Sequence, residues 1–508
     1  MLLHKILDKA VEKTPGKKAV ICRGSSCTYG QLFDRMNLWA KTLLSLGIKK
    51  GDRVALFMKN RVELVQLYFA CFRIGAIAVP LNTRYRTPEA EYAVSHSGSR
   101  ILIASSELFP VVMDIKSTIS SLEGVYIIDE DSEHQSISWS KASPDPGDHI
   151  SFPDVDIYDP GIIIYTSGST ARPKGAVHTN YSLYHHVLNK TKSQELGKNE
   201  IGLAATQICH IAAFAGIMLP TLYKGGIFVM VKEFEAEDYI RHLKEYKPTI
   251  LILLPTELLE ILEHPDAKDA DFSHIHSMLV AGDKVPHHTY ELFRKLAGFD
   301  LMEGCGMTEC EGYCIQPKHE KKKPGSIGKP IPGVKIRLVD KECNDVPDGK
   351  TGEILLKANS LMAGYWDDPE ETRKAFVDGW FRTGDLAYKD QDGYYHFVSR
   401  IKEIIIRGGS NIVPGEVEDV LDDHPKVESS GVVGFPDEHY GSIVGAFIVP
   451  EHGMPAPTID DLSAFASKRL AQYKVPEKWI IVENLPRNAV GKIDRRELHR
   501  LAEKYIAT

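Results

Sequence analysis

The sequence predicts an α/β protein with a large N-terminal domain of layered sheets, a small β-rich part, and a small C-terminal α+β domain. Three observations support this fold class. Helical patterns alternate with short apolar runs over about the first 300 residues, short strands separated by Gly, Pro and Asp follow between about 325 and 400, and the pattern changes again after Arg400. Alternating strands and helices are typical of layered α/β sheets.

The N-terminal part contains the clearest elements. Residues 29–47 and 62–75 have helical patterns, and the apolar runs 53–58 and 76–81 are predicted strands. Further along, we expect a buried strand over 249–254, a helix over 257–262 and a strand over 277–281. Each predicted strand is near a predicted helix, so sheets covered by helices are expected.

The later part of the chain contains shorter elements. Strands are predicted over 334–340, 352–358, 379–385 and 393–399, which gives a small β-rich unit. The residues after Arg400 alternate short helices and strands over about a hundred positions, enough for a separate domain. We therefore predict domains over 1–400 and 401–508, joined by a short hinge at 400–402.

Composition and charge exclude several classes of protein. The 508 residues suggest about two to four structural units, and 43% hydrophobic with 26% charged residues is typical of a globular protein. The net charge is −8, from 61 basic and 69 acidic residues, and the longest basic run is 321–323, so a nucleic-acid partner is not expected.

Neither a membrane span nor a secretory signal is predicted. No run approaches the roughly 18 apolar residues of a spanning helix. Lys5, Asp8 and Lys9 interrupt the apolar stretch at the N-terminus, which favours an amphipathic surface helix over a signal peptide. We expect a cytoplasmic protein.

The cysteines favour reduced thiols. Eight are scattered along the chain, which in a large protein argues against a disulfide framework. Cys305, Cys310 and Cys314 are closely spaced, but no CxxC pair or zinc-type His spacing accompanies them, so a metal site is disfavoured there.

The strongest local motif is Gly161–Gly175, an apolar strand that leads into a loop of hydroxyls, glycines and one lysine. Small residues let backbone N–H groups approach an anion, hydroxyls donate hydrogen bonds, and Lys174 adds positive charge, so the loop can surround phosphate. A mobile Gly/Ser turn is the alternative. The P-loop pattern GxxxxGK[ST] fails because Pro173 replaces the second glycine and Gly175 follows the lysine.

A second motif is Glu303-Gly-Cys-Gly-Met-Thr-Glu309. It lacks the last glycine of GxGxxG, so a dinucleotide-binding loop is not supported. A carboxylate beside a hydroxyl suits Mg²⁺, whose few protein ligands are oxygens shared with substrate phosphates. A solvated acid in a loop is the alternative for Glu309.

Four motifs in order resemble the adenylate-forming superfamily of acyl-CoA synthetases, adenylation domains and luciferases. They are YTSGSTARPKG, GCGMTE, the segment from GWFRTGD to GGSNIVPGEVE, and PRNAVGKIDRREL. The resemblance begins at TYGQL and GDRVAL and covers nearly the whole chain, and it is closest to fatty acyl-CoA ligases.

The resemblance implies ATP, Mg²⁺ and coenzyme A as ligands. Thr308 would contact the α-phosphate, Glu309 would bind Mg²⁺, Asp385 would accept from the ribose hydroxyls, and Arg400 would be its cationic partner. The remaining nucleotide-site residues it implies are Thr166, Ser167, Gly168, Ser169, Thr170 and Lys174 in the phosphate loop, with Gly282, Asp283, Lys284, Gly304, Cys305, Gly306 and Met307 near adenine.

One position departs from the family. An aromatic residue that stacks on adenine usually stands between the two glycines, and Cys305 replaces it here. Loss of one stacking face costs about 1 kcal/mol. Weaker ATP binding and compensation by Tyr313 are the two alternatives.

The resemblance also implies a mobile C-terminal domain. Lys492 resembles the catalytic lysine that would bridge the carboxylate and the triphosphate. Lys402 matches the hinge, and Gly408-Gly409 would let the pantetheine arm of coenzyme A pass close to the backbone. Two conformations are expected, one for adenylation and one for thioester formation.

The predicted substrate is a hydrophobic carboxylic acid. His210 matches a histidine at the acyl-pocket entrance and is followed by the small, apolar segment 211–216. Ile211 stands where amino-acid-activating relatives have an aspartate, and no arginine is available for a second carboxylate. Burial yields about 0.8 kcal/mol per methylene, which favours a fatty acid.

Other activities remain open. An aryl acid is an alternative substrate, and a carrier protein is an alternative acceptor to coenzyme A. A luciferase-type oxidation and a catalytically silent binding protein are less favoured. The sequence leaves the oligomeric state open and is compatible with a homodimer.

Overall fold

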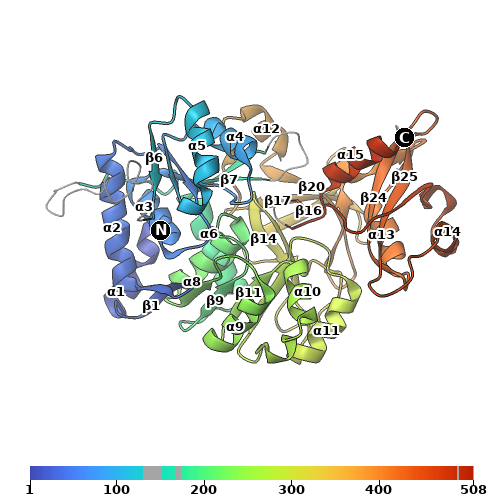
Figure 1. The fold of residues 1–508 in the computed structure, drawn as a ribbon, viewed down its shortest axis with the longest axis horizontal. Helices are drawn as coiled ribbons and strands as arrows, with labels where there is room; N and C mark the ends of the chain where they lie inside the picture. Colours follow the sequence, from blue (N-terminus) through green and yellow to red (C-terminus); the bar gives the residue numbers. More distant parts are fainter. Residues whose placement is uncertain (130–150, 167–172, 489–490, 507–508) are drawn as a thin grey trace. The chain divides into compact units, whose positions relative to one another are not determined.

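The computed structural model describes residues 1–129, 151–166, 173–488 and 491–506. The chain forms two compact units (Figure 1). The first contains Met1–Lys335 and Lys357–Phe381, and the second contains Ile336–Leu356 and Arg382–Thr508. The chain passes between them within β16 (Val334–Val339), β17 (Gly352–Ala358) and β20 (Trp380–Lys389). The boundary at 400–402 stays a prediction.

The described residues of the first unit form two large sheets. In order across the larger sheet, the strands are β15 (Lys329–Pro330), β14 (Cys310–Ile315), β13 (Glu303–Met307), β12 (Ser277–Ala281), β11 (Ile250–Leu253), β9 (Ile201–Ala204), β10 (Ile227–Met230), β1 (Lys18–Cys22) and β2 (Ser25–Thr28). The other sheet has the order β18 (Gly364–Tyr365), β8 (Gly175–Thr179), β7 (Pro160–Tyr165), β4 (Ile77–Pro80), β3 (Arg53–Phe57), β5 (Ile101–Ala104) and β6 (Gly124–Ile127).

Helices connect and cover these strands. They include α1 (Asp8–Lys13), α2 (Tyr29–Ser45), α3 (Val62–Ile74), α4 (Thr87–Ser97), α5 (Phe109–Thr118), α6 (Asn180–Ser193), α7 (Ile211–Ala213), α8 (Leu219–Tyr223), α9 (Ala236–Tyr246), α10 (Pro255–Glu263), α11 (His287–Ala297) and α12 (Pro369–Ala375). The Thr28 hydroxyl accepts from Gln31 N–H at 3.2 Å and Gln31 Oε1 accepts from Thr28 N–H, a capping box that fixes the start of α2. The helices predicted over 29–47 and 62–75 are therefore confirmed to within two residues.

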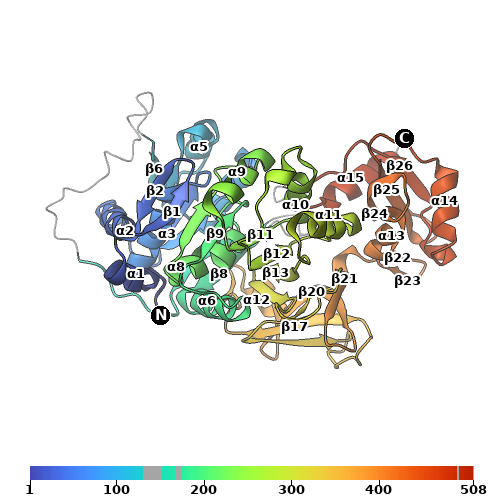
Figure 2. The same cartoon turned by 90° about the horizontal axis from the view of Figure 1, so that it is seen from below.

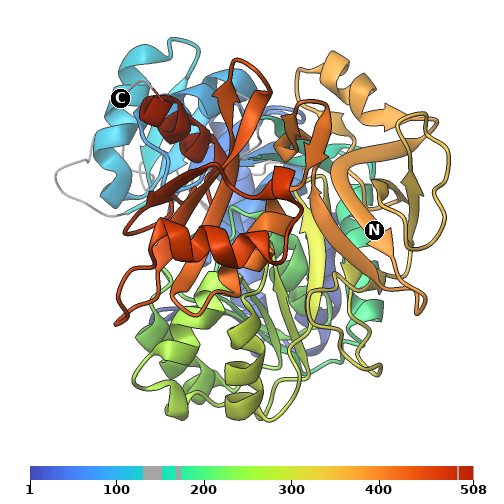
Figure 3. The same cartoon turned by 90° about the vertical axis from the view of Figure 1, so that its right-hand side faces the viewer.

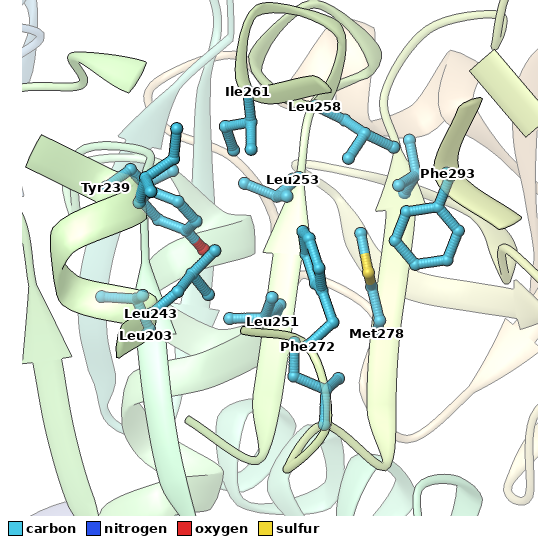
Figure 4. Close-up of a cluster of buried hydrophobic side chains, with 14 of the residues drawn as sticks. Leu203, Tyr239, Leu243, Leu251, Leu253, Leu258, Ile261, Phe272, Met278 and Phe293 are labelled. Atoms are coloured by element: carbon cyan, nitrogen blue, oxygen red, sulfur yellow. The ribbon is translucent and has the colours of Figure 1, made fainter. Parts of the chain in front are cut away.

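One core of the larger sheet lies between its central strands and α9, α10 and α11 (Figures 2 and 4). Buried side chains of β9, β11 and β12 face those of the three helices. Figure 4 labels Leu203, Tyr239, Leu243, Leu251, Leu253, Leu258, Ile261, Phe272, Met278 and Phe293. This burial holds the carboxyl ends of the parallel strands in a fixed order, which places the loops that follow them.

The second unit contains a β-rich part and an α+β part. β16, β17 and β20 are neighbours in that order, and β21 (Tyr395–Arg400) pairs with β20. β19 (Phe376–Val377) pairs with the first two residues of β20 within the first unit. The hairpin β22 (Ile405–Arg407) and β23 (Ser410–Ile412) follows, and then β24 (Val427–Asp437), β25 (Gly441–Pro450) and β26 (Lys478–Ile481) form one sheet. Its helices are α13 (Pro414–Asp422), α14 (Ile459–Ser467) and α15 (Arg495–Ile506) (Figure 3, orange to red).

This architecture confirms the predicted fold class. Among the described residues after Arg400, one core lies around β24, β25, α13 and α14, and another lies between the same strands and α15. The N-terminal segment is helical as predicted, but it is divided into a 3₁₀ turn, Leu3–Ile6, and α1. Among the described residues, no helix has both the length and the apolar character required to span a bilayer.

Candidate active site

The loop of the first motif joins two paired strands. β7 and β8 are antiparallel, with Tyr165 opposite Gly175, and Thr166 N–H donates to the Lys174 carbonyl at 2.9 Å. The predicted residues Ser167, Gly168, Ser169 and Thr170 lie outside the described residues. The strand predicted to lead into this loop is confirmed as β7, and Lys174 directly precedes β8.

Lys174 contacts a segment far along the chain. Its ammonium forms an ion pair with Glu371 and lies 4.9 Å from the ring centroid of Tyr365. The two segments meet because β18 pairs with β8, with Tyr365 opposite Ala176, and because Trp366 N–H donates to the Gly175 carbonyl at 2.7 Å. The strand β8, which begins directly after Lys174, is therefore paired with β7 on one side and with β18 on the other, and this pairing fixes the position of Lys174.

Glu371 is fixed at the start of α12. Asp368 caps this helix, since its Oδ1 accepts from Glu371 N–H at 2.9 Å. Hydrogen bonds from Lys174 and Lys374 lower the pKa of Glu371 to about 2. The Glu371 carboxylate is therefore ionised at neutral pH and attracts the Lys174 ammonium.

Thr308 and Glu309 form the two-residue turn between β13 and β14, with Met307 opposite Cys310. The strands approach closely at Gly306, where a Cβ would lie 2.3 Å from Gly312 N. A side chain at this position would collide with backbone. The glycine of the second motif is therefore required by packing between the strands.

Three hydrogen bonds hold the turn. His178 Nε2–H donates to the Thr308 carbonyl at 2.7 Å, Met362 N–H donates to the Glu309 carbonyl at 2.8 Å, and the Tyr365 hydroxyl donates to Glu309 Oε1 at 2.7 Å. Burial raises the pKa of Tyr365, and the neighbouring Glu309 carboxylate raises it further. Tyr365 therefore remains a hydrogen-bond donor at neutral pH and touches both predicted phosphate-site residues, Lys174 and Glu309.

The chemistry of Glu309 fits Mg²⁺ bound together with a nucleotide. Its side chain is 8% exposed, and the described part of the chain has no group of three or more His, Cys, Asp or Glu that could hold a metal ion. Mg²⁺ is commonly held by one or two carboxylates, substrate phosphates and water rather than by a protein cage. A single buried carboxylate in a turn satisfies that requirement.

Cys305 lies on β13 and is partly exposed. Its Sγ is 3.0 Å from the hydroxyl of Tyr313, whose ring is fully buried. The compensation by Tyr313 considered above is therefore not supported, since a buried ring offers no face for adenine to stack on. Gly304 and Met307 lie on the same strand.

The predicted adenine turn follows β12. Gly282, Asp283 and Lys284 are exposed, and Gly282 has φ of 105°, which places it in a region favoured by glycine. Asp283 Oδ1 accepts from Lys284 N–H at 2.9 Å. This turn is at the carboxyl end of a parallel strand, the usual place for ligands of such sheets.

His210 is the N-cap of α7. The chain continues into a π-helical turn, Phe214–Met218, and turns of this kind are frequent at functional sites. Phe214 is buried with its ring 5.1 Å from that of Tyr68. The segment after His210 is therefore packed tightly from its first turn onward.

A buried ionic cluster borders this segment at Gly216. A Cβ at Gly216 would lie 2.7 Å from Glu311 Oε1, and Glu311 Oε2 is 2.9 Å from His186 Nε2. Burial raises the pKa of Glu311, but the charges of His186 and Lys190 outweigh this effect and lower it overall. The segment that looked wholly apolar in the sequence therefore has a carboxylate against it.

In the second unit, the strand pairing brings Asp385 and Arg400 together. They are opposite one another in β20 and β21, and Arg400 Nε lies 3.2 Å from Asp385 Oδ1. The Asp385 side chain is 5% exposed and that of Arg400 is 43% exposed. The acid and its predicted cationic partner are thus adjacent, as the motif implies.

The other predicted residues of this unit lie in turns. Lys402 is exposed in the 3₁₀ turn Ile401–Glu403. Gly408 and Gly409 form the two-residue turn of the β22–β23 hairpin, with φ of 52° and 82°, values typical of a type I′ turn. Lys492 follows Gly491, and its N–H donates to Asn488 Oδ1 at 3.1 Å.

The sequence did not point to Tyr365, Glu371, His178 or Glu311. Tyr365 and Glu371 stand in an acidic stretch that resembles an ordinary helix start, GYWDDPEE. His178 and Glu311 stand within or next to buried strands. A polar residue inside an otherwise apolar strand pattern was the available signal, because such a residue needs a partner.

Comparison with known proteins places this chain in a family. Residues 7–366 match the family described as AMP-binding enzyme, and residues 416–492 match the AMP-binding enzyme C-terminal domain. A feruloyl-CoA synthase of Amycolatopsis sp is 34% identical over 489 residues, which cover 96% of each chain. A long-chain-fatty-acid–CoA ligase of Bacillus subtilis (strain 168) is 30% identical over 530 residues, covering 98% of this chain and 94% of its own.

The solved structures agree. The crystal structure of the anthranilate CoA ligase AuaEII in complex with anthranoyl-AMP has a TM-score of 0.91 and 27% sequence identity to this chain, covering 100% of it and 98% of the ligase. The family similarity inferred from the four motifs is thereby confirmed. The chain belongs to the AMP-binding enzymes, the adenylate-forming family that includes the AMP-forming acid–CoA ligases.

Proposed function

We propose that this protein activates a carboxylic acid with ATP, releases pyrophosphate, and transfers the acyl group from the resulting acyl-adenylate to the thiol of coenzyme A. The observation that carries the proposal is the convergence of Lys174 and the Thr308–Glu309 turn on Tyr365 within the first unit. A cation and a buried carboxylate that contact the same side chain are what a magnesium–triphosphate complex requires.

In the first reaction, a carboxylate oxygen attacks the α-phosphorus and the bond to pyrophosphate breaks. Lys174 would bind the β- and γ-phosphates, and Thr308 would donate its hydroxyl to the α-phosphate. Mg²⁺, when bound through Glu309, supplies positive charge shared with the phosphate oxygens. The His178 bond to Thr308 holds the turn, so that little reorganisation is needed when ATP binds.

Lys492 would complete the charge balance of this step. Two unit charges about 4 Å apart repel by roughly 4 kcal/mol at an effective dielectric constant of 20, which opposes approach of the carboxylate to the phosphate. An ammonium between the two anions offsets this repulsion. Lys492 lies in a turn in which its N–H donates to Asn488 Oδ1.

Asp385 would hold the ribose. A carboxylate can accept from two hydroxyls at once, and the Arg400 guanidinium places a positive charge 3.2 Å from the buried Asp385 side chain. Arg400 is more exposed than its partner and would also face the nucleotide. The pair would orient AMP during both half-reactions.

In the second reaction, the thiolate of coenzyme A attacks the acyl carbonyl and AMP leaves, while the thiol proton passes to solvent. Gly408 and Gly409 would line the path of the pantetheine arm, because a glycine hairpin turn presents bare backbone. Lys402 would be the hinge on which the C-terminal domain changes between the two reactions.

We favour a fatty acid as the first candidate substrate. The segment after His210 has small, apolar side chains, and its Phe214 packs against the buried rings of Tyr68 and Phe72. Burial of methylenes against apolar side chains supplies binding energy in proportion to chain length.

An aryl acid with a hydroxyl group is the second candidate. Glu311 lies against Gly216, and one of its oxygens is paired with His186, so a carboxylate oxygen borders this segment as a hydrogen-bond acceptor. A phenolic hydroxyl could use that acceptor, whereas an alkyl chain could not. The similarity to a feruloyl-CoA synthase supports the same candidate.

The test is a panel of carboxylic acids assayed for pyrophosphate release with and without coenzyme A. The panel includes fatty acids of increasing length and the matched pair cinnamate and 4-hydroxycinnamate. Acid-dependent pyrophosphate release, with loss of free thiol when coenzyme A is present, supports the proposal. Pyrophosphate release without thiol loss, together with acylation of a holo-carrier protein, would instead identify a carrier-protein ligase.

A further inference from the structure

We propose that Tyr365 is a positioning residue that sets Lys174 and Glu309 in a single arrangement for magnesium and nucleotide. The inference rests on the proposed function, because it gives Lys174 and Glu309 the roles argued there. It assigns Tyr365 two separable actions: its hydroxyl orients the Glu309 carboxylate, and its ring holds the Lys174 ammonium.

The hydroxyl acts on Glu309. It donates to Oε1 at 2.7 Å, so the carboxylate has a fixed orientation and its Oε2 is the oxygen left to take a cation. Residues that hydrogen-bond a metal-binding carboxylate orient it, and removing one typically weakens metal binding about 10- to 100-fold. The burial of Glu309 makes the effect larger, since few water molecules can replace the phenol.

The ring acts on Lys174. The ammonium lies 4.9 Å from the ring centroid, within the usual limit of about 6 Å for a cation–π interaction. In the structure, the ammonium is also paired with Glu371, an anion that a triphosphate would replace. The ring is uncharged, so a triphosphate would not displace it. It would keep the Lys174 ammonium in place while the N–H donors of that ammonium turn from the Glu371 carboxylate to phosphate.

The backbone explains why Tyr365 can serve both groups. β18 pairs with β8 directly after Lys174, and Tyr365 N–H donates to Thr372 Oγ1 at 2.9 Å. Thr372 Oγ1 in turn donates to the Asp368 carbonyl at 2.8 Å. The backbone of Tyr365 is therefore anchored by strand pairing with β8 on one side and by the first turn of α12 on the other.

The experiment separates the two actions by measuring ATP affinity with saturating Mg²⁺ and again in EDTA. The variants are Tyr365→Phe, which removes only the hydroxyl, and Tyr365→Leu, which also removes the ring. Tyr29→Phe is the matched control: it removes a buried hydroxyl that donates to the Gly226 carbonyl at 2.7 Å in the same unit. Binding of Mn²⁺ in the presence of ATP, followed by electron paramagnetic resonance, is a second readout that needs no turnover.

We expect Tyr365→Phe to weaken Mg²⁺–ATP binding about 10-fold and to release bound Mn²⁺, while ATP affinity in EDTA changes less than about 2-fold. Tyr365→Leu should in addition weaken metal-free ATP binding about 3-fold through loss of the ring. Tyr29→Phe should leave both affinities unchanged.

Two results would overturn the inference while leaving the proposed function intact: Tyr365→Phe binding Mg²⁺–ATP like the wild type, or losing affinity equally with and without metal. If Tyr365→Leu fails to fold, Tyr365→Phe still decides the metal-linked action. Failure of the wild-type protein to bind ATP in either condition would instead overturn the proposed function, and this inference with it.

Discussion

His178 and Thr308 are joined by a 2.7 Å hydrogen bond across 130 residues of sequence. Burial is the main cause that lowers the pKa of His178 to about 4, so the imidazole is neutral at pH 7 and its Nε2–H is the donor. The bond connects the β13–β14 turn of the larger sheet to β8 of the other sheet of the first unit. The Thr308–Glu309 turn is thereby held in place before any ligand binds.

Replacement of His178 by Ala is expected to destabilise the protein by about 1–3 kcal/mol, because a buried carbonyl loses its donor. ATP affinity should fall as well, since the turn is released. Urea unfolding and ATP titration measure the two effects. His288→Ala is the control, because that side chain is 51% exposed on α11; equal losses in both variants would argue against a role for the His178 bond.

Gly306→Ala should prevent normal pairing of β13 and β14, since the new Cβ would be 2.3 Å from a backbone nitrogen that cannot move aside. We expect a loss of stability of about 2 kcal/mol or more. Gly16→Ala, which meets no atom within 4 Å, is the matched control and should be nearly neutral. Thermal unfolding distinguishes them, and two equal melting temperatures would contradict the steric argument.

Lys492→Ala is predicted to reduce adenylation about 10²–10³-fold, because the charge that stabilises the transition state is lost. Thioester formation from supplied acyl-adenylate should survive. The two half-reactions are followed separately by pyrophosphate release and thiol consumption, with the exposed Lys468→Ala as control. Equal loss in both half-reactions would contradict the two-conformation proposal.

Gly409→Leu should have the opposite effect, with adenylation retained and thioester formation impaired. A Leu at a φ of 82° carries a backbone cost of about 1 kcal/mol, although its Cβ would meet no atom within 4 Å. Gly441→Leu, with φ of 76° and equally open surroundings, reproduces that cost elsewhere in the same unit. Intact thioester formation in Gly409→Leu, or the same defect in both variants, would refute a role in the coenzyme A path.

Glu303 gives a prediction for pH dependence. Burial raises its pKa to about 7, although Gly325 N–H donates to Oε1 at 2.9 Å. The folded protein therefore holds a proton that the unfolded chain releases near pH 4.5, so this carboxyl stabilises the fold below pH 4.5 and loses that contribution as pH rises to 7. Relative to wild type, Glu303→Gln should gain stability between these values, by up to about 3 kcal/mol. A stability difference independent of pH, from denaturant unfolding, would contradict this.

Much of the fold could be predicted because its helices and strands are encoded locally. The predicted strand over 277–281 matches β12 residue for residue, and the other early elements differ by a few residues at their ends. Periodic burial explains this success, since one face of each helix and both faces of the parallel strands are apolar. The division of the N-terminal helix at Leu7 was not predicted, because tertiary packing of Leu3 and Ile6 decides it.

The site could be predicted only where a motif is contiguous. Lys174, Glu309, Asp385 and Lys492 stand in motifs that can be read directly. Tyr365 and Glu371 could not be found in this way, because their relation to Lys174 depends on a strand pairing between distant segments. The carboxylate of Glu311 was missed for a related reason, since its neighbour Gly216 is on another element.

The two-residue strand β18 has a consequence for exchanging parts between relatives. Lys174 and Glu371 are 197 positions apart, yet the segment around residue 365 forms the outer edge of the sheet beside residue 175. A chimera that receives only residues 160–180 from a relative would therefore combine a donor loop with a host edge strand. A chimera should therefore take residues 360–375 and the loop from the same relative, although the two segments are far apart in the sequence.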